Sequence, residues 1–178
     1  MMEEPPLRPT GREMNLKNIL ARTAGITCSL LVAGVVNAVL PAQVIGPPYP
    51  SQHIYPSIAA ASSDIHAAIL QASHEHKRVI LDFGGDWCPD CQVLNIYFNQ
   101  SPNRELLEKY FIRVNVNIGH EDANVDIAHH YGVPLHGVPA LAVLDSHGRL
   151  LYAQNKEFAD MRHLQPSDLT AFLEKWKP

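Results

Sequence analysis

The stretch Asp86–Cys91, which reads DWCPDC, contains two cysteines separated by two residues. It follows an apolar run at residues 78–83 that is typical of a short buried strand and that ends at a pair of glycines. It leads into residues 91–100, whose apolar side chains recur at helical spacing. A C-x-x-C pair between a strand and a helix indicates a redox site. The free N–H groups and the positive dipole end of the helix stabilise a thiolate there.

The two cysteines have different predicted roles. We expect Cys88 to be exposed and to attack a substrate disulfide as the nucleophile. Cys91 lies one turn into the helix, and we expect it to be more buried and to resolve the mixed disulfide. Pro89 and Asp90 lie between the two cysteines and tune their redox chemistry. The negative charge of Asp90 opposes thiolate formation while the helix terminus favours it, so the redox potential stays open.

Helices and strands alternate on both sides of this stretch. The predicted helices are residues 63–75, 91–100, 104–110, 122–131 and 166–177, and the predicted strands are residues 78–83, 111–118, 140–144 and 149–153. A tight-turn composition between the last two strands favours a hairpin. A strand–helix–strand half followed by a strand–strand–helix half predicts an α/β fold, in which helices cover both faces of a central mixed β-sheet.

Residues 1–38 have the pattern of a secretory signal peptide. A basic region precedes an apolar run at residues 24–36, and short residues precede a cleavage position after Ala38. Met14 is an alternative start of translation. An uncleaved membrane anchor is the other interpretation, although the apolar run is shorter than the roughly 20 residues that a spanning helix needs. Cys28 lies inside this segment and would be lost on cleavage.

Composition separates a proline-rich segment from the globular part. Residues 39–58 contain five prolines and predict a stiff, extended linker or N-terminal arm, so that the folded domain covers residues 59–178. The whole chain has 14 Lys and Arg against 18 Asp and Glu, a net charge of −4. Without a basic surplus to neutralise phosphates, we expect no nucleic-acid partner. Three cysteines are too few for a disulfide-rich scaffold.

Residues 60–178 resemble the thioredoxin superfamily, and within it the exported domains similar to the C-terminal domain of the bacterial disulfide-interchange protein DsbD. The matching segments are Leu81-Asp82-Phe83, Asp86–Cys91, Tyr131-Gly132-Val133 and Gly137-Val138-Pro139-Ala140. The resemblance implies a thioredoxin fold.

The resemblance also implies roles for residues around the cysteines. Pro139 matches a cis-proline beside the pair, which leaves the backbone of Val138 free to bind an extended substrate segment. Asp82 matches a buried acid that accepts the proton of Cys91 through water. Trp87 shields the pair and adds contact surface for the substrate.

Two positions depart from the thioredoxin pattern. The dipeptide between the cysteines is Pro89-Asp90 rather than Gly-Pro. The strand position at which thioredoxins place a lysine near the buried acid is Asn115. Both departures concern the charges that control proton transfer at the cysteines.

Together these features predict a thiol–disulfide oxidoreductase of an exported compartment such as the bacterial periplasm. It would act on protein disulfides without a bound cofactor. The resemblance favours a reductase, which would need a membrane electron donor of the DsbD type.

Two alternatives stay open. The cysteine pair could belong to a metal-handling protein for zinc or copper, completed by histidines such as His74, His76, His129, His130 or His136. It could also form an inert structural disulfide, although Trp87 and the Gly137–Pro139 element would then have no purpose. His136 is expected to line the substrate groove, because it lies three residues before Pro139.

Overall fold

A computed structural model describes residues 51–154 and 156–178. The predicted signal peptide, residues 1–38, lies outside the described residues, as does the first part of the predicted linker, residues 39–50. Within the described ranges no helix is long and apolar enough to cross a membrane.

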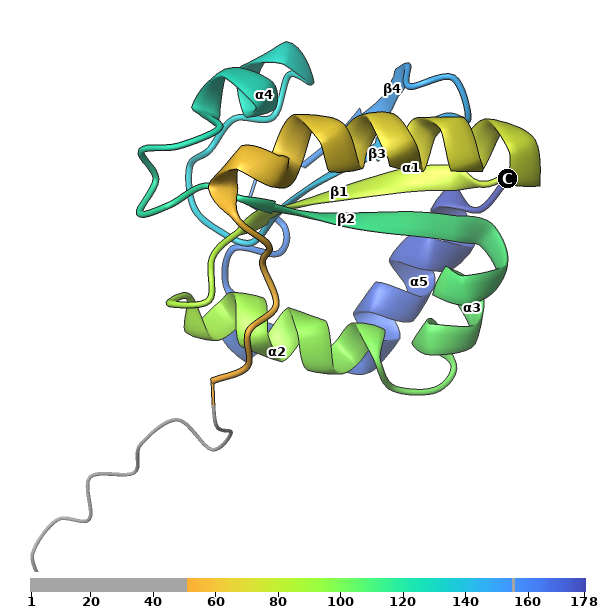
Figure 1. The fold of residues 1–178 in the computed structure, drawn as a ribbon. Helices are drawn as coiled ribbons and strands as arrows, with labels where there is room; N and C mark the ends of the chain where they lie inside the picture. Colours follow the sequence, from red (N-terminus) through yellow and green to blue (C-terminus); the bar gives the residue numbers. More distant parts are fainter. Residues whose placement is uncertain (1–50, 155) are drawn as a thin grey trace, which may run out of the picture. The chain divides into compact units, whose positions relative to one another are not determined.

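The described residues form a mixed sheet in the strand order β2-β1-β3-β4. Its strands are β1 (Arg78–Gly84), β2 (Phe111–Asn117), β3 (Ala140–Leu144) and β4 (Leu150–Ala153). β2 runs parallel to β1, whereas β3 is antiparallel to both β1 and β4. Figure 1 shows β1 at the centre of the domain, with β2 on one side of it and β3 on the other. The loop after β1 therefore begins at the middle of the sheet. The expected mixed sheet is confirmed.

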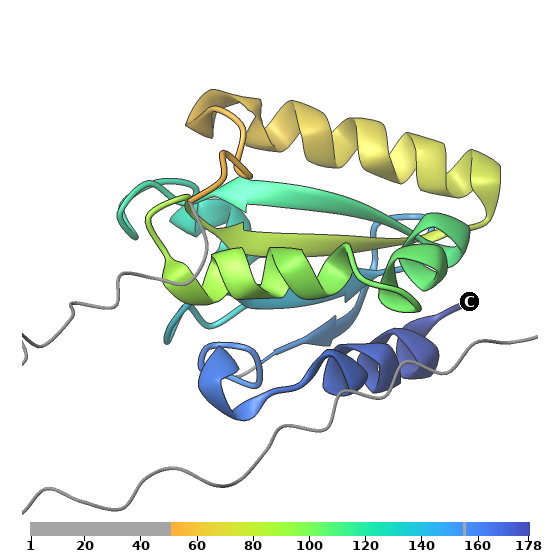
Figure 2. The ribbon, with the colours of Figure 1, turned by 90° about the horizontal axis from the view of Figure 1, so that it is seen from below.

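Helices cover both faces of this sheet, as expected (Figures 1 and 2). α1 (Ala61–Glu75) and α4 (Val125–His130) pack on one face, and α2 (Pro89–Phe98), α3 (Asn103–Tyr110) and α5 (Pro166–Trp176) pack on the other. Two short 3-10 turns, η1 (Ile58–Ala60) and η2 (Met161–His163), precede α1 and α5.

Alternation along β1 gives each face its own core. Val79, Leu81 and Phe83 are buried on the side of α1 and α4, whereas Ile80 is buried on the side of α2 and α5. Asp82 has the same parity as Ile80, so its carboxyl group enters the layer beneath α2. The sheet thereby places one buried acid under the helix that carries the cysteines.

The five predicted helices differ from the observed ones by one to three residues at one end or both, and α2 and α4 differ most. α2 begins at Pro89 rather than at residue 91, because Cys88 is the N-cap and proline suits the first helical position. α4 spans Val125–His130 rather than residues 122–131. Glu121 and Asn124 have positive φ angles of 68° and 53°, which are incompatible with a helix before residue 125.

The boundary of the folded domain also differs from the prediction. The last part of the predicted linker, residues 51–58, is described, and Tyr55 within it is fully buried. The domain therefore begins before residue 59. Polar side chains of the domain bind the backbone of residues 52–58. We call these residues the arm.

Candidate active site

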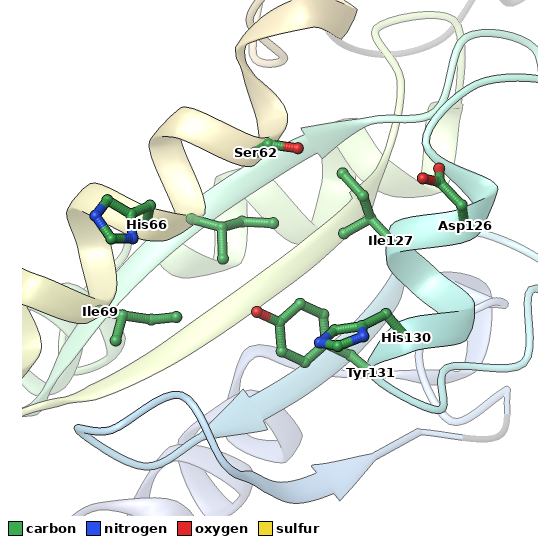
Figure 3. A pocket seen from close by; sticks show the side chains of 8 residues that line it. Ser62, His66, Ile69, Asp126, Ile127, His130 and Tyr131 are labelled. Carbon is green, nitrogen blue, oxygen red and sulfur yellow. The ribbon is translucent and has the colours of Figure 1, made fainter.

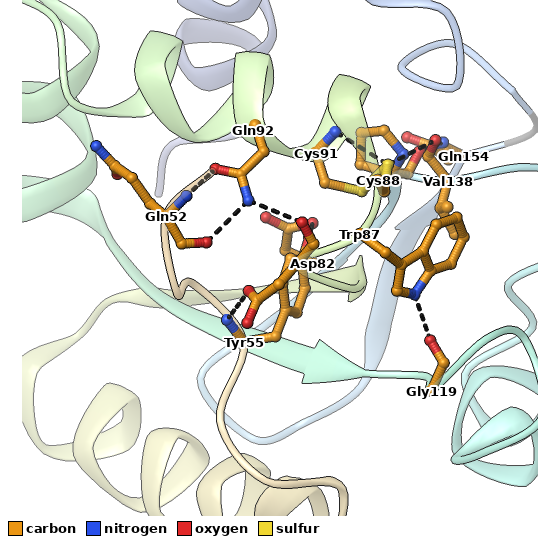
Figure 4. Close-up of a disulfide and its surroundings, with 12 residues drawn as sticks. Gln52, Tyr55, Asp82, Trp87, Cys88, Cys91, Gln92, Gly119, Val138 and Gln154 are labelled. Atoms are coloured by element: carbon orange, nitrogen blue, oxygen red, sulfur yellow. Dashed lines mark hydrogen bonds between the residues drawn. A yellow bond between two sulfur atoms is a disulfide. The ribbon is translucent and has the colours of Figure 1, made fainter. Parts of the chain in front are cut away.

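The two cysteines form a disulfide at the N-terminus of α2 (Figure 4). Their Cα atoms are 5.3 Å apart, and the backbone N–H of Cys91 donates to Sγ of Cys88 over 3.1 Å. Pro89 occupies the first turn of the helix without needing a hydrogen-bond partner, and Asp90 adds the acidic group of that turn. The helix terminus thus directs a donor at the sulfur of Cys88, where it stabilises a thiolate.

Cys88 is buried, contrary to the expectation that it would be exposed. Its exposed fraction is 3%, and that of Cys91 is 1%. The pair forms a small apolar cluster with Tyr55, against which Ile54 and Val138 pack. Two residues of the arm therefore help to cover the sulfur of Cys88, which the sequence alone places at the surface.

The segment before β3 reaches the cysteine pair. The carbonyl oxygen of Val138 lies 3.5 Å from Sγ of Cys88, and the Val138–Pro139 peptide bond is cis. Gln154, which is buried, donates through Nε2 to the carbonyl of Pro139 over 2.8 Å and through its backbone N–H to Leu141. Sequence reasoning missed Gln154, because a lone glutamine at the end of an edge strand carries no signal.

Trp87 flanks the pair on another side and is 43% exposed. Its indole Nε1 donates to the carbonyl oxygen of Gly119 (Figure 4). Its ring stacks on that of His120, with the centroids 5.4 Å apart. The loop between β2 and α4 therefore fixes the orientation of an exposed aromatic ring beside the disulfide. An exposed, immobilised aromatic side chain is suited to contact with another protein.

Asp82 lies beneath α2 with an exposed fraction of 1%. The hydroxyl of Tyr55 donates to its Oδ1 over 3.0 Å. Burial raises the pKa of the Asp82 carboxyl group, while the positive charge of Arg113 and the hydrogen bond from Tyr55 act in the opposite direction. A carboxyl group with a raised pKa accepts a proton more readily than an exposed aspartate, which is the property the resemblance assigned to it.

The cation near Asp82 comes from Arg113 rather than from the residue in register with the acid. Asn115 is the β2 partner of Asp82, and its Nδ2 donates to the carbonyl of Ile54. Arg113 is two residues earlier on the same face of β2, where its Nη2 donates to Asn95 over 2.7 Å. The strand periodicity of two already places residues 113 and 115 on one face, so this signal was available in the sequence.

Asp86 is the principal anchor of the arm. Its Oδ1 accepts hydrogen bonds from the backbone N–H groups of Ile54 over 2.7 Å and Tyr55 over 3.0 Å. Its Oδ2 lies 2.6 Å from Nδ1 of His53. Further side-chain amides bind carbonyl groups of the arm: Gln92 binds Gln52, Asn115 binds Ile54, Asn117 binds Pro56 and Asn124 binds Ile58. These contacts attach the arm beside the cysteine helix.

Comparison with known proteins finds a family match and a similar solved structure. Residues 60–146 match the model of a thioredoxin-like family. The crystal structure of a disulphide isomerase from Xylella fastidiosa Temecula1 is 29% identical, covers 71% of this chain and 98% of that chain, and has a TM-score of 0.66. The domain that contains residues 60–146 is a thioredoxin-like domain. Its cysteine pair at the start of α2 is that of a thioredoxin-like thiol–disulfide oxidoreductase.

A domain of DsbD is also among the similar solved structures. The reduced C-terminal domain of DsbD from Neisseria meningitidis is 24% identical, covers 65% of this chain and 96% of that chain, and has a TM-score of 0.49. No curated protein sequence matches the chain significantly.

Two hollows of the thioredoxin-like domain lie apart from the cysteine pair, because neither cysteine lines them. One of about 440 Å³ lies between α1 and α4 and is lined by Ile65, Ile127, Tyr131 and polar residues that include His66 and His130 (Figure 3). Another, of about 540 Å³, includes His136 in its lining. Among residues 51–154 and 156–178 no group of three histidine, cysteine or acidic side chains is arranged to hold a metal ion.

Replacing Asp82 with Asn is expected to stabilise the domain at neutral and alkaline pH. The pKa of Asp82 is raised by burial in the folded state, so at a pH between the unfolded and the folded pKa the folded chain retains a proton that the unfolded chain has released. The stability linked to this proton is complete below the unfolded pKa and is lost as the pH rises through the folded pKa. Urea unfolding of both proteins over a pH series should give curves that coincide in acid and separate with rising pH. A constant offset at every pH would contradict the raised pKa.

Proposed function

We propose that this thioredoxin-like protein reduces disulfides of other proteins in an exported compartment. The observation that carries the proposal is the Cys88–Cys91 disulfide at the N-terminus of α2, with the Val138 carbonyl 3.5 Å from the sulfur of Cys88. A dithiol in this position accepts an oxidised substrate and ends as the disulfide that the structure contains. Trp87, Val138 and Pro139 form the surface that contacts the substrate.

The reaction consists of two exchanges. The thiolate of Cys88 attacks one sulfur of the substrate disulfide, which forms a mixed disulfide and releases the other substrate sulfur as a thiolate. Cys91 then loses its proton to Asp82 and attacks the sulfur of Cys88, which releases the second substrate thiolate. The substrate gains two electrons and the cysteine pair loses two. A membrane electron donor of the DsbD type would return the pair to the reduced form.

Burial of the pair sets a requirement on the substrate. Cys88 is only 3% exposed, so its sulfur is reached only when Ile54 and Val138 move aside or when a flexible segment enters between them. An extended segment of a partly unfolded protein meets this requirement, and it can also pair with the backbone at Val138 as an added strand.

Export is supported by sequence features that the described residues do not include. The apolar run at residues 24–36 and the short residues before Ala38 have the pattern of a cleaved signal peptide. Determination of the N-terminus of the protein after expression with its full leader tests this part. A new N-terminus near Val39 is expected, whereas retention of Met1 or Met14 would favour an anchor.

The direction of the reaction is tested by equilibrating the cysteine pair against glutathione. A reduction potential near or below about −220 mV is expected for a reductase. A potential near about −120 mV would instead indicate an oxidant. Failure to form a reversible disulfide, together with retention of copper or zinc by the reduced protein, would favour metal handling.

Isomerisation is a second candidate, favoured by the similarity to the Xylella fastidiosa protein described as a disulphide isomerase. Isomerisation uses the same attack by Cys88 but returns the electrons to the cysteine pair. Reactivation of scrambled ribonuclease by catalytic amounts of the reduced protein measures it. A protein that reduces insulin rapidly but does not reactivate ribonuclease is a reductase in the narrower sense.

A further inference from the structure

The space beneath Cys91 is filled by a side chain from the arm. A Cβ atom added at Gly84 would lie 2.7 Å from Sγ of Cys91 and would overlap the hydroxyl oxygen of Tyr55. The sulfur and the hydroxyl therefore border the same small space above the end of β1. Glycine at position 84 leaves this space open to them. Figure 4 shows the ring of Tyr55 beneath the helix that carries both cysteines.

The same hydroxyl is hydrogen bonded to the buried acid. Tyr55 is 0% exposed, and its hydroxyl donates to Oδ1 of Asp82 over 3.0 Å. A hydroxyl group has one proton to donate and two lone pairs with which to accept. Because the proton of Tyr55 is directed to Asp82, a lone pair remains for the thiol of Cys91 once the disulfide is reduced.

We propose that Tyr55 relays the proton of Cys91 to Asp82. This inference rests on the proposed exchange reaction and replaces the water expected between the two groups. In the resolving step the S–H proton of Cys91 passes to the hydroxyl oxygen of Tyr55, while the hydroxyl proton of Tyr55 passes to Asp82. The products are a Cys91 thiolate, a neutral tyrosine and a protonated Asp82. The thiolate then attacks the sulfur of Cys88, and Asp82 returns its proton through Tyr55 to solvent when the site reopens.

The surroundings of Tyr55 suit a group that passes protons and stays neutral. Burial raises the pKa of Tyr55 well above 10, and the negative charges of Asp82 and Asp86 act in the same direction, against the positive charge of Arg113. The tyrosine therefore does not ionise on its own at neutral pH. It accepts the proton of Cys91 as it donates its own, and Asp82 keeps the transferred proton.

Tyr55 lies in the arm, and side chains of β2 and of the loop after β1 hold the arm in place. The N–H group of Tyr55 is bound by Asp86, and neighbouring carbonyl groups of the arm are bound by Asn115 and Asn117. These bonds hold the arm on both sides of the tyrosine. The relay therefore requires a protein that contains residues 52–58.

The test is the reaction of the reduced protein with dithionitrobenzoate, which separates the two exchanges. Attack by Cys88 releases a first nitrothiobenzoate anion, and resolution by Cys91 releases a second one. Tyr55→Phe removes the hydroxyl and retains the ring. We expect the second phase to slow about tenfold and to require higher pH, with the first phase unchanged. Tyr97→Phe is the matched control, because the Tyr97 hydroxyl binds the carbonyl of Leu164 away from the cysteines.

Two further variants distinguish a relay from a structural role. In the double variant of Tyr55→Phe with Asp82→Asn, a shared relay predicts a second phase no slower than that of the slower single variant, whereas independent effects multiply. Gly84→Ala forces the Tyr55 hydroxyl or the Cys91 sulfur to move and should also slow the second phase. This variant replaces Tyr55→Phe in the test if Tyr55→Phe does not fold.

The outcomes separate the relay from the proposed function. If Tyr55→Phe releases the second anion at the wild-type rate and with the wild-type pH profile, the relay is wrong and the exchange reaction stands. Equal slowing of both phases at every pH would also overturn the relay. If the unmodified protein releases no second anion, the proposed exchange itself fails.

Discussion

Replacing Cys88 with Ala is expected to reduce the rate of insulin reduction by about a thousandfold, to the uncatalysed background. The thiolate of Cys88 forms the first covalent bond with the substrate, and Cys91 is not placed to substitute for it. Cys91 is 1% exposed and lies one turn inside α2, whereas Sγ of Cys88 receives the N–H donor of the helix terminus. The rate is measured by the turbidity of precipitating insulin chains in dithiothreitol.

The matched variant for this prediction is Cys91→Ala. It keeps the attacking thiolate but lacks the resolving one, so it should accumulate mixed disulfides with substrates that a gel without reductant detects. The disulfide closes only a very short loop, since two residues separate the cysteines. Its removal therefore costs little stability, and both variants should fold. Wild-type activity of Cys88→Ala would exclude the mechanism proposed above.

The arrangement of helices and strands follows from periodicity in the sequence. Alternating apolar residues place β2 within one residue of its observed end, and the apolar run before the glycines marks β1. The prediction for α2, residues 91–100, starts and ends two residues late. The start is misplaced because a cysteine serves as the N-cap in place of the usual serine, threonine or aspartate. Local pattern is sufficient here because each element buries a face that its own residues define.

The surroundings of the cysteines depend instead on contacts that leave little trace in the sequence. Tyr55 precedes Asp82 by 27 residues and lies in a proline-rich segment whose composition is that of a linker. The arm is bound chiefly through its backbone N–H and C=O groups, which every sequence possesses. Burial of Cys88 beneath Ile54 is a consequence of the same contacts and could not be predicted without them.

Asp82 and Asp86 affect the pH dependence of stability in opposite directions. Burial raises the pKa of Asp82, so its contribution to stability declines as the pH rises. At Asp86 burial also acts to raise the pKa, but hydrogen bonds from Ile54, Tyr55 and His53 outweigh it and hold the pKa below its usual range. The contribution of Asp86 is therefore complete above its unfolded pKa and is lost as the pH falls through the folded value.

Replacing Asp86 with Ala is expected to lower the free energy of unfolding by about 3 kcal/mol at neutral pH. Two backbone N–H groups of the arm, those of Ile54 and Tyr55, lose a charged acceptor, and each such bond contributes about 1.5–3 kcal/mol. Asp86→Asn is the matched control, because its amide oxygen can still accept both bonds, and it should lose less than about 1 kcal/mol. Urea unfolding at neutral pH measures both changes.

Release of the arm should also change the chemistry of the cysteines in a way that loss of stability alone does not. With Asp86→Ala, the arm no longer holds Ile54 and Tyr55 against the pair, so alkylation of reduced Cys88 should accelerate under conditions in which the sheet stays folded. The resolving step should slow, as with Tyr55→Phe, because the hydroxyl leaves Asp82. Faster alkylation without slower resolution would show that the arm only covers the sulfur atoms. Equal behaviour of the Ala and Asn variants would show that Asp86 does not anchor the arm, because only the Asn side chain keeps an acceptor at that position.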